Sequence, residues 1–529
     1  MSATVADPEL DPTATYAVEP ATVRRLASRA VTGPRPEQLT TVTPMTGAPL
    51  ATLPLSTPDD VRVAVASART AQRAWARTSM ERRERVLLRL HDSVLRRQVE
   101  LLDIVQLESG KARRHAFEEI MDVAIVARHY GRSASAYLRP RRHLGAFPLL
   151  TRSTEHHRPR GVVGIVSPWN YPLSLSITDA LPALMAGNAV VLRPDPQASL
   201  SALLGLEMLL DAGLPEGVLQ VVLGDGASVG QAVVDTADYV CFTGSTATGR
   251  RVARSAAERL VGFSLELGGK NALYVADDAS LGRAVDGAVR GCFSSAGQLC
   301  ISAERLIVHE DIADRFLPRF VDAVVRMRLG TALEFGYDMG SLVSRAQLDR
   351  VVEHVEDARA KGATVLAGGH ARPDLGPFFY EPTVLEGVTP DMACRDGETF
   401  GPVVSVYRVT SDEEAISLAN DTAYGLNASV WTRDTERGRA IASRLRTGTV
   451  NINEAYAAAW GSVASPMGGM KDSGIGRRHG AEGILRYTES QNVTVQHLVG
   501  IAPPRGVSDR AFAAALTVSL RALKSLGVR

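Results

Sequence analysis

The sequence predicts an α/β protein whose parallel sheets are covered by helices on both faces. From residue 161 onward, short apolar segments rich in β-branched residues alternate with helical segments. Such alternation is typical of βαβ units and of buried parallel strands. The chain has 529 residues, which is too many for one hydrophobic core, so two or three folding units are expected.

The region before this alternation is predicted to be mainly helical. Residues 22–30 favour a short helix. Thr57 can cap a following helix, because Pro58 suits its first turn and Asp60 lies near the positive end of its dipole. Residues 84–97 place four apolar side chains on one helical face.

The alternating part divides into two stretches. The first has predicted strands at residues 161–167, 189–192, 218–223 and 239–242, and predicted helices at residues 173–185, 199–210, 227–234 and 246–260. The second, at about 271–453, has predicted strands at residues 305–308 and 403–407 and predicted helices at residues 312–327 and 413–419. Ligands are expected at the carboxyl ends of the parallel strands.

The tail from Val507 reads as an amphipathic helix that Ser508 can cap. Its apolar stripe is expected to pack on the body of the protein rather than to bind a partner.

Composition and charge exclude several classes of function. The net charge is +1, from 59 basic and 58 acidic residues, so no nucleic-acid or membrane partner is expected. The four cysteines form no CxxC pair and have no adjacent histidine cluster, which predicts neither a disulfide framework nor a zinc site. Without an apolar run of 18 residues or a signal-peptide pattern, the expected location is the cytoplasm.

Three strings carry the candidate chemistry: residues 167–172 (SPWNYP), 265–271 (LELGGKN) and 293–300 (FSSAGQLC). Taken singly, each has a plain explanation as a turn, a tight bend or an inert buried cysteine. Four further strings stand in a fixed order with them, at residues 186–194, 242–246, 398–402 and 466–474. Together they resemble the aldehyde dehydrogenase superfamily over residues 45–495. The sequence looks most like the branch of bacterial succinate-semialdehyde dehydrogenases (NADP+).

The resemblance implies the aldehyde dehydrogenase fold, with a Rossmann-like cofactor domain, an α/β catalytic domain and a small β oligomerisation arm. The expected segments are an N-terminal extension (1–34), a cofactor domain (35–140 and 158–266), an arm (141–157), a catalytic domain (267–470), a return to the core with the second arm piece (471–499) and a C-terminal helix (500–529). The strand-like residues 488–496 are polar at alternate positions. Such an edge needs a partner strand, so a homodimer or homotetramer is expected.

The resemblance also assigns catalytic roles. Cys300 matches the nucleophile, whose thiolate attacks the aldehyde carbon to give a thiohemiacetal. The side-chain amide of Asn170 and the backbone N–H of Cys300 match the donors to the resulting oxyanion, worth about 3 to 4 kcal/mol each. Glu266 matches the general base that activates water to hydrolyse the later thioester.

A dinucleotide cofactor is expected at the helix that begins after Ser245, because its free N–H groups favour a pyrophosphate. By resemblance, Glu398 holds the nicotinamide ribose and Phe400 packs near the ring. The predicted cofactor-binding residues are Ser167, Trp169, Asn170, Arg193, Asp195, Pro196, Gly226, Gly244, Ser245, Thr248, Leu267, Glu398 and Phe400.

The residues expected near the adenosine ribose favour NADP, with NAD as the alternative. Members of the family that prefer NAD commonly carry a glutamate where this chain has Pro196, and most members have lysine at Arg193. Loss of the carboxylate removes a repulsion of the 2′-phosphate, and Arg193 offers it a planar fork. Asp195, one residue away, partly restores the repulsion if it points into the same pocket. Pro196→Glu is predicted to reverse the preference.

The favoured substrate is succinate semialdehyde, but two expected residues are missing. Relatives with this activity bind the substrate carboxylate with two arginines, at the positions of Thr178 and Ser294. An anionic substrate therefore needs another cation, and the nearest in sequence to the motif concerned are Arg477, Arg478 and His479. A solvated or subunit-facing loop is nevertheless the expected role of these three residues.

Three alternatives stay open. The first is a dehydrogenase of uncharged aromatic or aliphatic aldehydes, and the second is a catalytically silent binding or structural protein on the same fold. The third, a coenzyme-A-acylating member, is disfavoured by the carboxylate base Glu266. The remaining cysteines are expected to be inert: Cys241 in a core strand, Cys292 in a helix and Cys394 in a loop.

Overall fold

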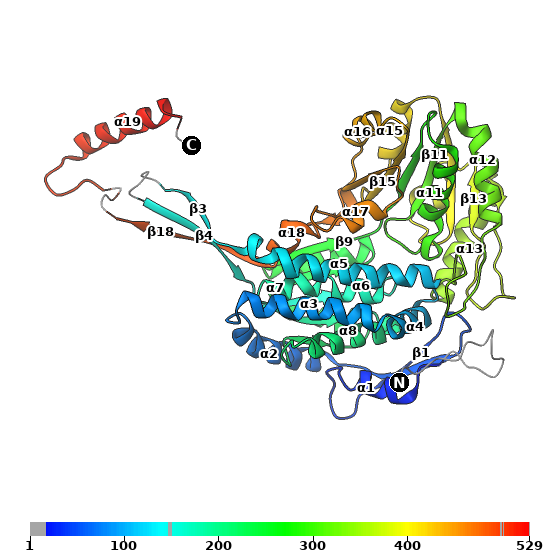
Figure 1. Cartoon of the computed structure of the whole chain (residues 1–529), viewed down its shortest axis with the longest axis horizontal. Helices are drawn as coiled ribbons and strands as arrows, with labels where there is room; N and C mark the ends of the chain where they lie inside the picture. Colours follow the sequence, from blue (N-terminus) through cyan, green and yellow to red (C-terminus); the bar gives the residue numbers. More distant parts are fainter. Residues whose placement is uncertain (1–16, 146–150, 498–499, 501, 528–529) are drawn as a thin grey trace.

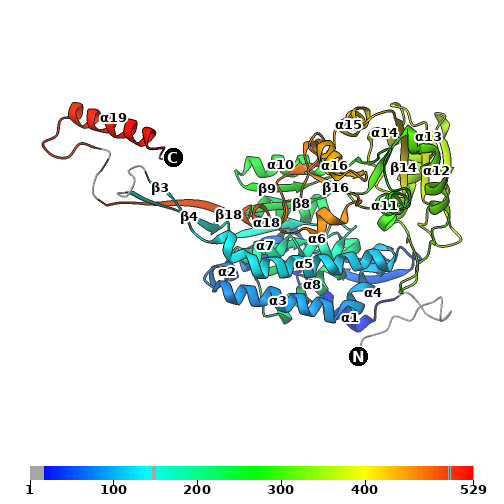
Figure 2. The same cartoon turned by 45° about the horizontal axis from the view of Figure 1, so that its top comes forward.

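The computed structural model describes residues 17–145, 151–497, 500 and 502–527. Two large sheets form the body, and a three-stranded arm projects from it (Figures 1 and 2). Within the described residues, no helix combines the length and the apolar character needed to cross a membrane.

The first sheet has six strands in the order β17-β9-β8-β5-β6-β7. Their bounds are β5 Val162–Val166, β6 Ala189–Arg193, β7 Leu219–Val221, β8 Tyr239–Thr243, β9 Gly262–Glu266 and β17 Gly474–Ile475. All neighbours are parallel except β17, which pairs antiparallel with β9. Every residue of β5 and β6 is buried, as expected for parallel strands that are covered on both faces.

The helices around this sheet come from segments before, between and after its strands in the sequence. Their bounds are α2 Pro58–Trp75, α3 Met80–Arg96, α4 Gln98–Ser109, α5 Arg113–Leu138, α6 Pro172–Ile177, α7 Ala180–Met185, α8 Ser199–Asp211, α9 Gln231–Thr236, α10 Thr246–Glu258 and α18 Gly480–Leu485. Thr57 and Asp60 form the capping box that begins α2. Before these helices lie α1 Pro20–Ala27 and the hairpin of β1 Gln38–Val42 and β2 Pro49–Pro54.

The second sheet has seven strands in the order β12-β13-β14-β11-β10-β15-β16. Their bounds are β10 Asn271–Val275, β11 Ala303–His309, β12 Thr364–Ala367, β13 Thr383–Glu386, β14 Val403–Val409, β15 Asn427–Trp431 and β16 Thr449–Ile452. Only β12 runs antiparallel to its neighbour. The associated helices are α11 Leu281–Phe293, α12 Glu310–Val325, α13 Arg345–Ala360, α14 Ala393–Asp396, α15 Asp412–Asn420, α16 Thr435–Ala442 and α17 Ala457–Gly461.

The arm consists of β3 Arg141–Leu144, β4 Thr151–Pro159 and β18 Thr488–Gln496. β4 lies between the other two, and its antiparallel register with β18 joins Pro159 to Thr488 and Thr151 to Gln496. The predicted strand at residues 488–496 is thus confirmed. The domain boundaries stated above stay a prediction.

Three local predictions differ from the structure. The helix predicted at residues 173–185 is divided into α6 and α7, because Pro182 has no N–H to donate to the carbonyl of Thr178. The helix predicted at 227–234 begins instead with a π-helical turn, Gly226–Gly230. Cys394 lies in α14, not in a loop.

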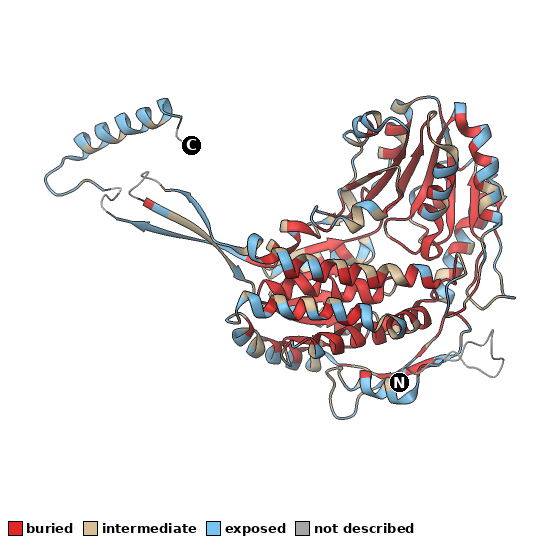
Figure 3. Ribbon diagram, in the orientation of Figure 1, coloured by how far each residue is buried: buried red, intermediate tan, exposed pale blue. Residues whose placement is uncertain are grey.

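The C-terminal helix α19, Asp509–Ser525, begins after a Ser508 cap as predicted. The expectation that its apolar stripe packs on the body is wrong, because no residue of α19 is buried (Figure 3). In Figure 1, α19 lies near the tip of the arm and away from the two sheets of the body.

Candidate active site and cofactor site

Cys300 lies just beyond the end of α11, in a segment that turns sharply. After α11, Ser295, Ala296 and Gly297 have φ values of 50°, 56° and 69°, which form the turn that leads to Cys300. A Cβ on Gly297 would lie 2.0 Å from the carbonyl oxygen of Gly401, so only glycine fits there. The turn leaves Cys300 half-buried, whereas the other three cysteines are fully buried.

The thiol of Cys300 needs help to ionise in this environment. Burial raises its pKa to about 12, and the positive charge of Arg478 is the main influence that opposes this rise. A thiolate, not a thiol, is the nucleophilic form. A neighbouring base is therefore required for attack at neutral pH.

Glu266 is the last residue of β9, the strand that lies between β8 and β17 in the first sheet. Its side chain is buried, and its Oε1 has no hydrogen-bond partner among the described residues. Burial raises the pKa of this carboxyl to about 7, against the opposing charge of Arg478. A carboxylate with such a pKa is suited to accept a proton near neutral pH.

Asn170 follows β5 and is held from several directions. Its Nδ2 donates a hydrogen bond of 3.0 Å to the carbonyl of Gln298, two residues before Cys300. Its own carbonyl accepts a hydrogen bond of 2.6 Å from Nζ of Lys111, which also pairs with Glu119 at 2.6 Å. The amide therefore lies beside the cysteine segment, in a fixed orientation.

The predicted residues meet where two pockets join at Cys300. One pocket is lined by Trp169, Asn170, Gly244, Ser245, Glu266, Leu267, Cys300, Glu398 and Phe400, all of which were predicted. Within it, Oε1 of Glu398 accepts a hydrogen bond of 2.8 Å from the backbone N–H of Gly269. The rings of Trp169 and Phe400 meet edge-to-face, with centroids 5.6 Å apart.

This pocket continues into a cavity of about 390 Å³ beneath the N-terminus of α10. Its predicted lining residues are Ser167, Trp169, Arg193, Asp195, Gly226, Gly244 and Thr248. The Ser245 side chain caps α10, and the helix N-terminus and nearby glycine backbone suit a pyrophosphate. The residues present therefore fit a dinucleotide that extends from this cavity toward Cys300.

Pro196 is the one predicted cofactor residue that lines none of these pockets. It begins a short 3-10 turn that Asp195 caps by accepting the N–H of Gln197 at 3.1 Å. Asp195 lines the cavity itself, with Arg193. Sequence reasoning missed Arg251 in this cavity, and Gln347 and Arg350 of α13 in the adjoining pocket. No motif marks these three residues.

A second pocket leads from Cys300 away from the cofactor cavity. Its apolar wall contains Tyr171, Leu175, Leu299, Ile301, Tyr456, Trp460 and Met467. The hydroxyls of Tyr171 and Tyr456 donate to the half-buried carboxylate of Glu118, at 2.8 and 2.7 Å. Glu118 was not predicted, because a charge within a helix usually marks a solvated face.

The expectation for Arg478 and His479 is corrected. Both side chains line the pocket of Cys300, whereas the sequence favoured a solvated or subunit-facing loop for them. Arg478 forms an ion pair with Asp179 and donates to the hydroxyl of Thr243 at 3.0 Å. Arg477, by contrast, is not among the lining residues and donates to the backbone carbonyls of Gly469 and Gly476.

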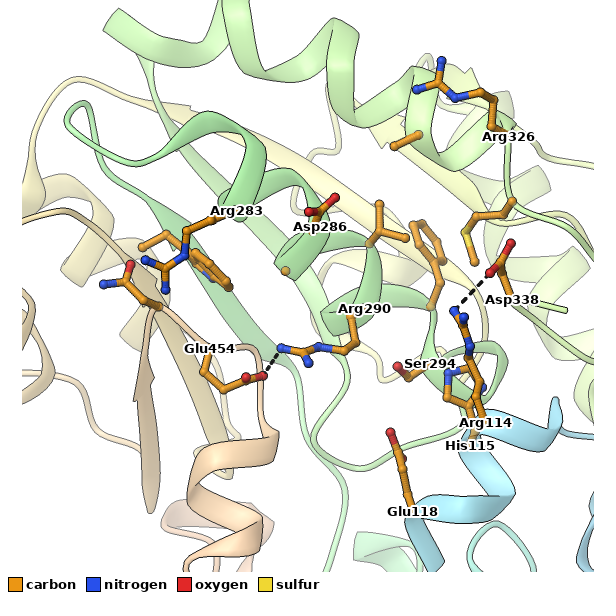
Figure 4. A pocket seen from close by; sticks show the side chains of 17 residues that line it. Arg114, His115, Glu118, Arg283, Asp286, Arg290, Ser294, Arg326, Asp338 and Glu454 are labelled. Carbon is orange, nitrogen blue, oxygen red and sulfur yellow. Dashed lines mark hydrogen bonds and ion pairs between the residues drawn. The ribbon is translucent and has the colours of Figure 1, made fainter. Parts of the chain in front are cut away.

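The two positions at which related enzymes are expected to carry arginines line different cavities in this protein. Thr178 lines the pocket of Cys300. Ser294 lines a neighbouring cavity of about 720 Å³, shown in Figure 4, where Arg290 pairs with Glu454 and Arg114 with Asp338. Glu118 lines both spaces and so marks their junction.

Across the described parts of the chain, no group of three His, Cys, Asp or Glu side chains is arranged to hold a metal ion.

Comparison with known proteins gives one consistent result. Residues 31–493 match the aldehyde dehydrogenase family. The chain is 52% identical to a Mycolicibacterium smegmatis protein named "Putative succinate-semialdehyde dehydrogenase (NADP(+))", over 91% of this chain and 93% of that protein. It is 37% identical to the Pisum sativum protein named "Aminoaldehyde dehydrogenase 2, peroxisomal", over 87% and 92%.

Among solved structures, the chain resembles one titled "Crystal structure of E. coli NADP dependent enzyme". The TM-score is 0.83 and the identity 33%, over 87% of this chain and 95% of that one. The fold is therefore the aldehyde dehydrogenase fold expected from the sequence. The chain belongs to the aldehyde dehydrogenase family.

Proposed function

We propose that this protein oxidises succinate semialdehyde to succinate with NADP+, and that Cys300, Glu266 and Asn170 carry the chemistry. The supporting observation is their convergence at the junction of two pockets, one of which fits a dinucleotide while the other leads away from it. Family membership gives the reaction class, because aldehyde oxidation needs both an activated nucleophile and a hydride acceptor.

The first step is attack by Cys300 on the aldehyde carbon. Glu266, with its pKa near 7, accepts the thiol proton, directly or through water. The thiolate forms a C–S bond, and the carbonyl electron pair moves to oxygen. The side-chain amide of Asn170 and the backbone N–H of Cys300 stabilise this oxyanion, at about 3 to 4 kcal/mol per donor.

The second step is oxidation of the thiohemiacetal. NADP+, when bound, supplies the hydride acceptor. Glu398, anchored on the backbone of Gly269, and Phe400, packed against Trp169, orient the nicotinamide end. As the carbonyl re-forms, the product is a thioester on Cys300.

The last step is hydrolysis of this thioester. Glu266, after passing the thiol proton to solvent, removes a proton from water, and the resulting hydroxide attacks the thioester carbon. The C–S bond breaks, the carboxylic acid leaves, and the sulfur of Cys300 takes the proton from Glu266. The Oε1 atom of Glu266, unpaired within the described residues, is suited to hold that water.

The choice of NADP rests on the cavity beneath α10 and on the relatives. Arg193 and Arg251 both line the cavity, and the 52% identical relative is named for NADP(+). Asp195 lines the same cavity and opposes a 2′-phosphate. NAD therefore stays the alternative cofactor.

A second candidate is a dehydrogenase of uncharged aromatic or aliphatic aldehydes. It is favoured by the aromatic and aliphatic wall of the pocket that holds Cys300. Initial rates of NADP+ reduction with succinate semialdehyde, butanal and benzaldehyde separate the two. We expect kcat/KM for succinate semialdehyde to exceed that for both uncharged aldehydes. A preference for either uncharged aldehyde would reject our proposal.

We also propose that the protein is a homodimer or homotetramer. Support comes from β18, whose Val493 and Val495 are 41% and 47% exposed on an arm that projects from the body. An exposed edge strand with apolar side chains is normally covered by another chain. Light scattering coupled to gel filtration measures the mass, and a monomer at micromolar concentration would contradict the assignment.

A further inference from the structure

The pocket that contains Cys300 has an unusual polar corner at the start of α18. Arg478 and His479 are adjacent in sequence, and both side chains line the pocket. Thr178, where relatives with succinate-semialdehyde activity are expected to place an arginine, lines it too. The next residue, Asp179, forms the ion pair with Arg478. The Arg478 guanidinium is thereby held beside the position from which an arginine is missing.

Both polar side chains have unused hydrogen-bonding capacity. Nε of Arg478 and Nδ1 of His479 are buried and have no hydrogen-bond partner among the described residues. His479 is only 7% exposed. Burying a polar atom without a partner is costly, and native proteins rarely do so without a functional reason. The capacity of these two atoms is therefore available to a ligand in the pocket.

The backbone at His479 supplies an independent observation. Its φ is 65° and its ψ is 167°, a conformation that side chains other than glycine rarely adopt. Strained residues of this kind cluster at ligand-binding sites, where the surrounding structure holds them in place. At position 479 the strained backbone carries an imidazole instead of the hydrogen atom of a glycine, and this imidazole lines the pocket.

We propose that Arg478 and His479 form a carboxylate-binding subsite, which holds the acid end of the substrate while its aldehyde carbon lies at Cys300. This inference rests on the proposed function and names the groups that recognise the substrate. The guanidinium Nε–H and an imidazole N–H each donate to one carboxylate oxygen. Burial lowers the pKa of His479 to about 3, so the imidazole is a neutral donor and Arg478 supplies the charge.

The three acidic residues in and beside the pocket do not cancel the positive charge of this subsite. Asp179 forms ion pairs with both Arg478 and Arg486, and its distance to the guanidinium of Arg486 is 2.8 Å. Glu118 already accepts two tyrosine hydroxyls, at the junction with the larger cavity. Asp122 accepts the hydroxyl of Ser174, and burial raises its pKa to about 6. A cationic aldehyde would instead use Glu118 and Asp122, which makes it the outcome to test against.

The test compares four enzymes on three aldehydes of equal chain length: succinate semialdehyde, butanal and 4-aminobutanal. The variants are Arg478→Gln, His479→Gly and the control Arg283→Gln, which removes an arginine from the neighbouring cavity. Arg478→Gln leaves Asp179 with Arg486 as its partner, so the buried carboxylate keeps a counter-charge. His479→Gly removes the imidazole but tolerates the backbone conformation. Thermal unfolding and NADP+ binding establish that each variant is folded.

Because the charge of Arg478 also opposes the rise in the pKa of Cys300, we expect Arg478→Gln to lower kcat/KM for both aldehydes, but by at least about tenfold more for succinate semialdehyde than for butanal. His479→Gly should lower the first by about five- to tenfold and spare the second. Arg283→Gln should change neither by more than about twofold. Succinate should protect Cys300 from alkylation by iodoacetamide in the wild type and not in Arg478→Gln.

Each failure has a separate meaning. Equal losses with succinate semialdehyde and butanal would overturn the subsite and leave the proposed function standing. A wild type whose kcat/KM for butanal equals that for succinate semialdehyde would overturn the proposed substrate. The protection of Cys300 by succinate would then be the only test of the subsite. A wild-type preference for 4-aminobutanal would overturn both, in favour of recognition by Glu118 and Asp122.

Discussion

Nζ of Lys111 donates a hydrogen bond of 2.6 Å to the backbone carbonyl of Asn170, from a side chain that is 2% exposed. Its partner Glu119 accepts the backbone N–H groups of Leu173 and Ser174, at 2.9 and 3.0 Å, in the first turn of α6. One buried ion pair thus fixes the backbone of the proposed oxyanion donor and the helical turn that follows it. Its role is positioning, because neither charge lines the pocket of Cys300.

Replacing this pair should slow turnover without weakening cofactor binding. Lys111→Met combined with Glu119→Gln avoids leaving one buried charge alone, which would cost about 3 to 5 kcal/mol of stability. We expect kcat to fall by about ten- to a hundredfold, because a misplaced oxyanion donor loses stabilisation of the transition state. Lys361→Met, at a partly exposed ion pair, is the control. Unchanged kcat in the double variant would contradict the positioning role.

Cys300→Ala should abolish aldehyde oxidation and spare NADP+ binding, since only the nucleophile is lost. We expect a fall in kcat of at least about a thousandfold. Cys292→Ala is a matched control, because Cys292 is buried in α11 and lines none of the three pockets around the site. Steady-state rates and equilibrium binding of NADP+ measure the two effects. Residual turnover within tenfold of the wild type would exclude Cys300 as the nucleophile.

The pH dependence of kcat/KM should reflect the ionisation of the Glu266 carboxyl. Because the base acts as a carboxylate and burial raises its pKa to about 7, kcat/KM should fall as the pH drops below about 7. Glu266→Gln should remove this inflection and, where deacylation limits the rate, leave a first-turnover burst of NADPH. Burial also raises the pKa of Glu398 to about 7, so Glu398→Gln is the necessary comparison. An inflection that persists in Glu266→Gln and disappears in Glu398→Gln would reassign it.

The cofactor preference should respond to Asp195 more than to Pro196. The wild type is expected to prefer NADP, and Asp195→Asn should strengthen this preference by about fivefold or more, because a nearby carboxylate repels the 2′-phosphate. Pro196→Glu, predicted from sequence to reverse the preference, places its carboxylate at a position that does not line the cavity. Initial rates with both cofactors give the ratios. A wild type that prefers NAD tenfold would refute the assignment of NADP.

The strands β5 and β6 were predictable because their burial is complete. β5 and β6 have no exposed residue, so they appear in the sequence as short apolar runs between helical segments. The ordered motifs then located Cys300, Glu266 and Asn170 by resemblance. Of the two neighbouring residues that were predicted, Asp195 lines the cavity and Pro196 does not, because Pro196 begins the 3-10 turn after β6.

Arg478 shows what sequence could not provide. An arginine in a glycine-rich loop favours exposure, and its burial depends on Asp179, which lies 299 residues earlier. Glu118 is similar, because its partners Tyr171 and Tyr456 come from two distant segments. Such groups are recognisable only once tertiary contacts bring their partners together, since no local period records them.

The antiparallel pairing of β17 with β9 has a consequence for the order in which the protein matures. The ribosome completes β9 and its Glu266 well before β17 and the residues that follow it, including Arg478 and β18. Domains generally fold as they are made, yet this sheet keeps an open edge beside the base until the C-terminal segment returns to it. The edge of the sheet that carries Glu266 is therefore closed only after residues 474–475 have been synthesised and have paired with β9.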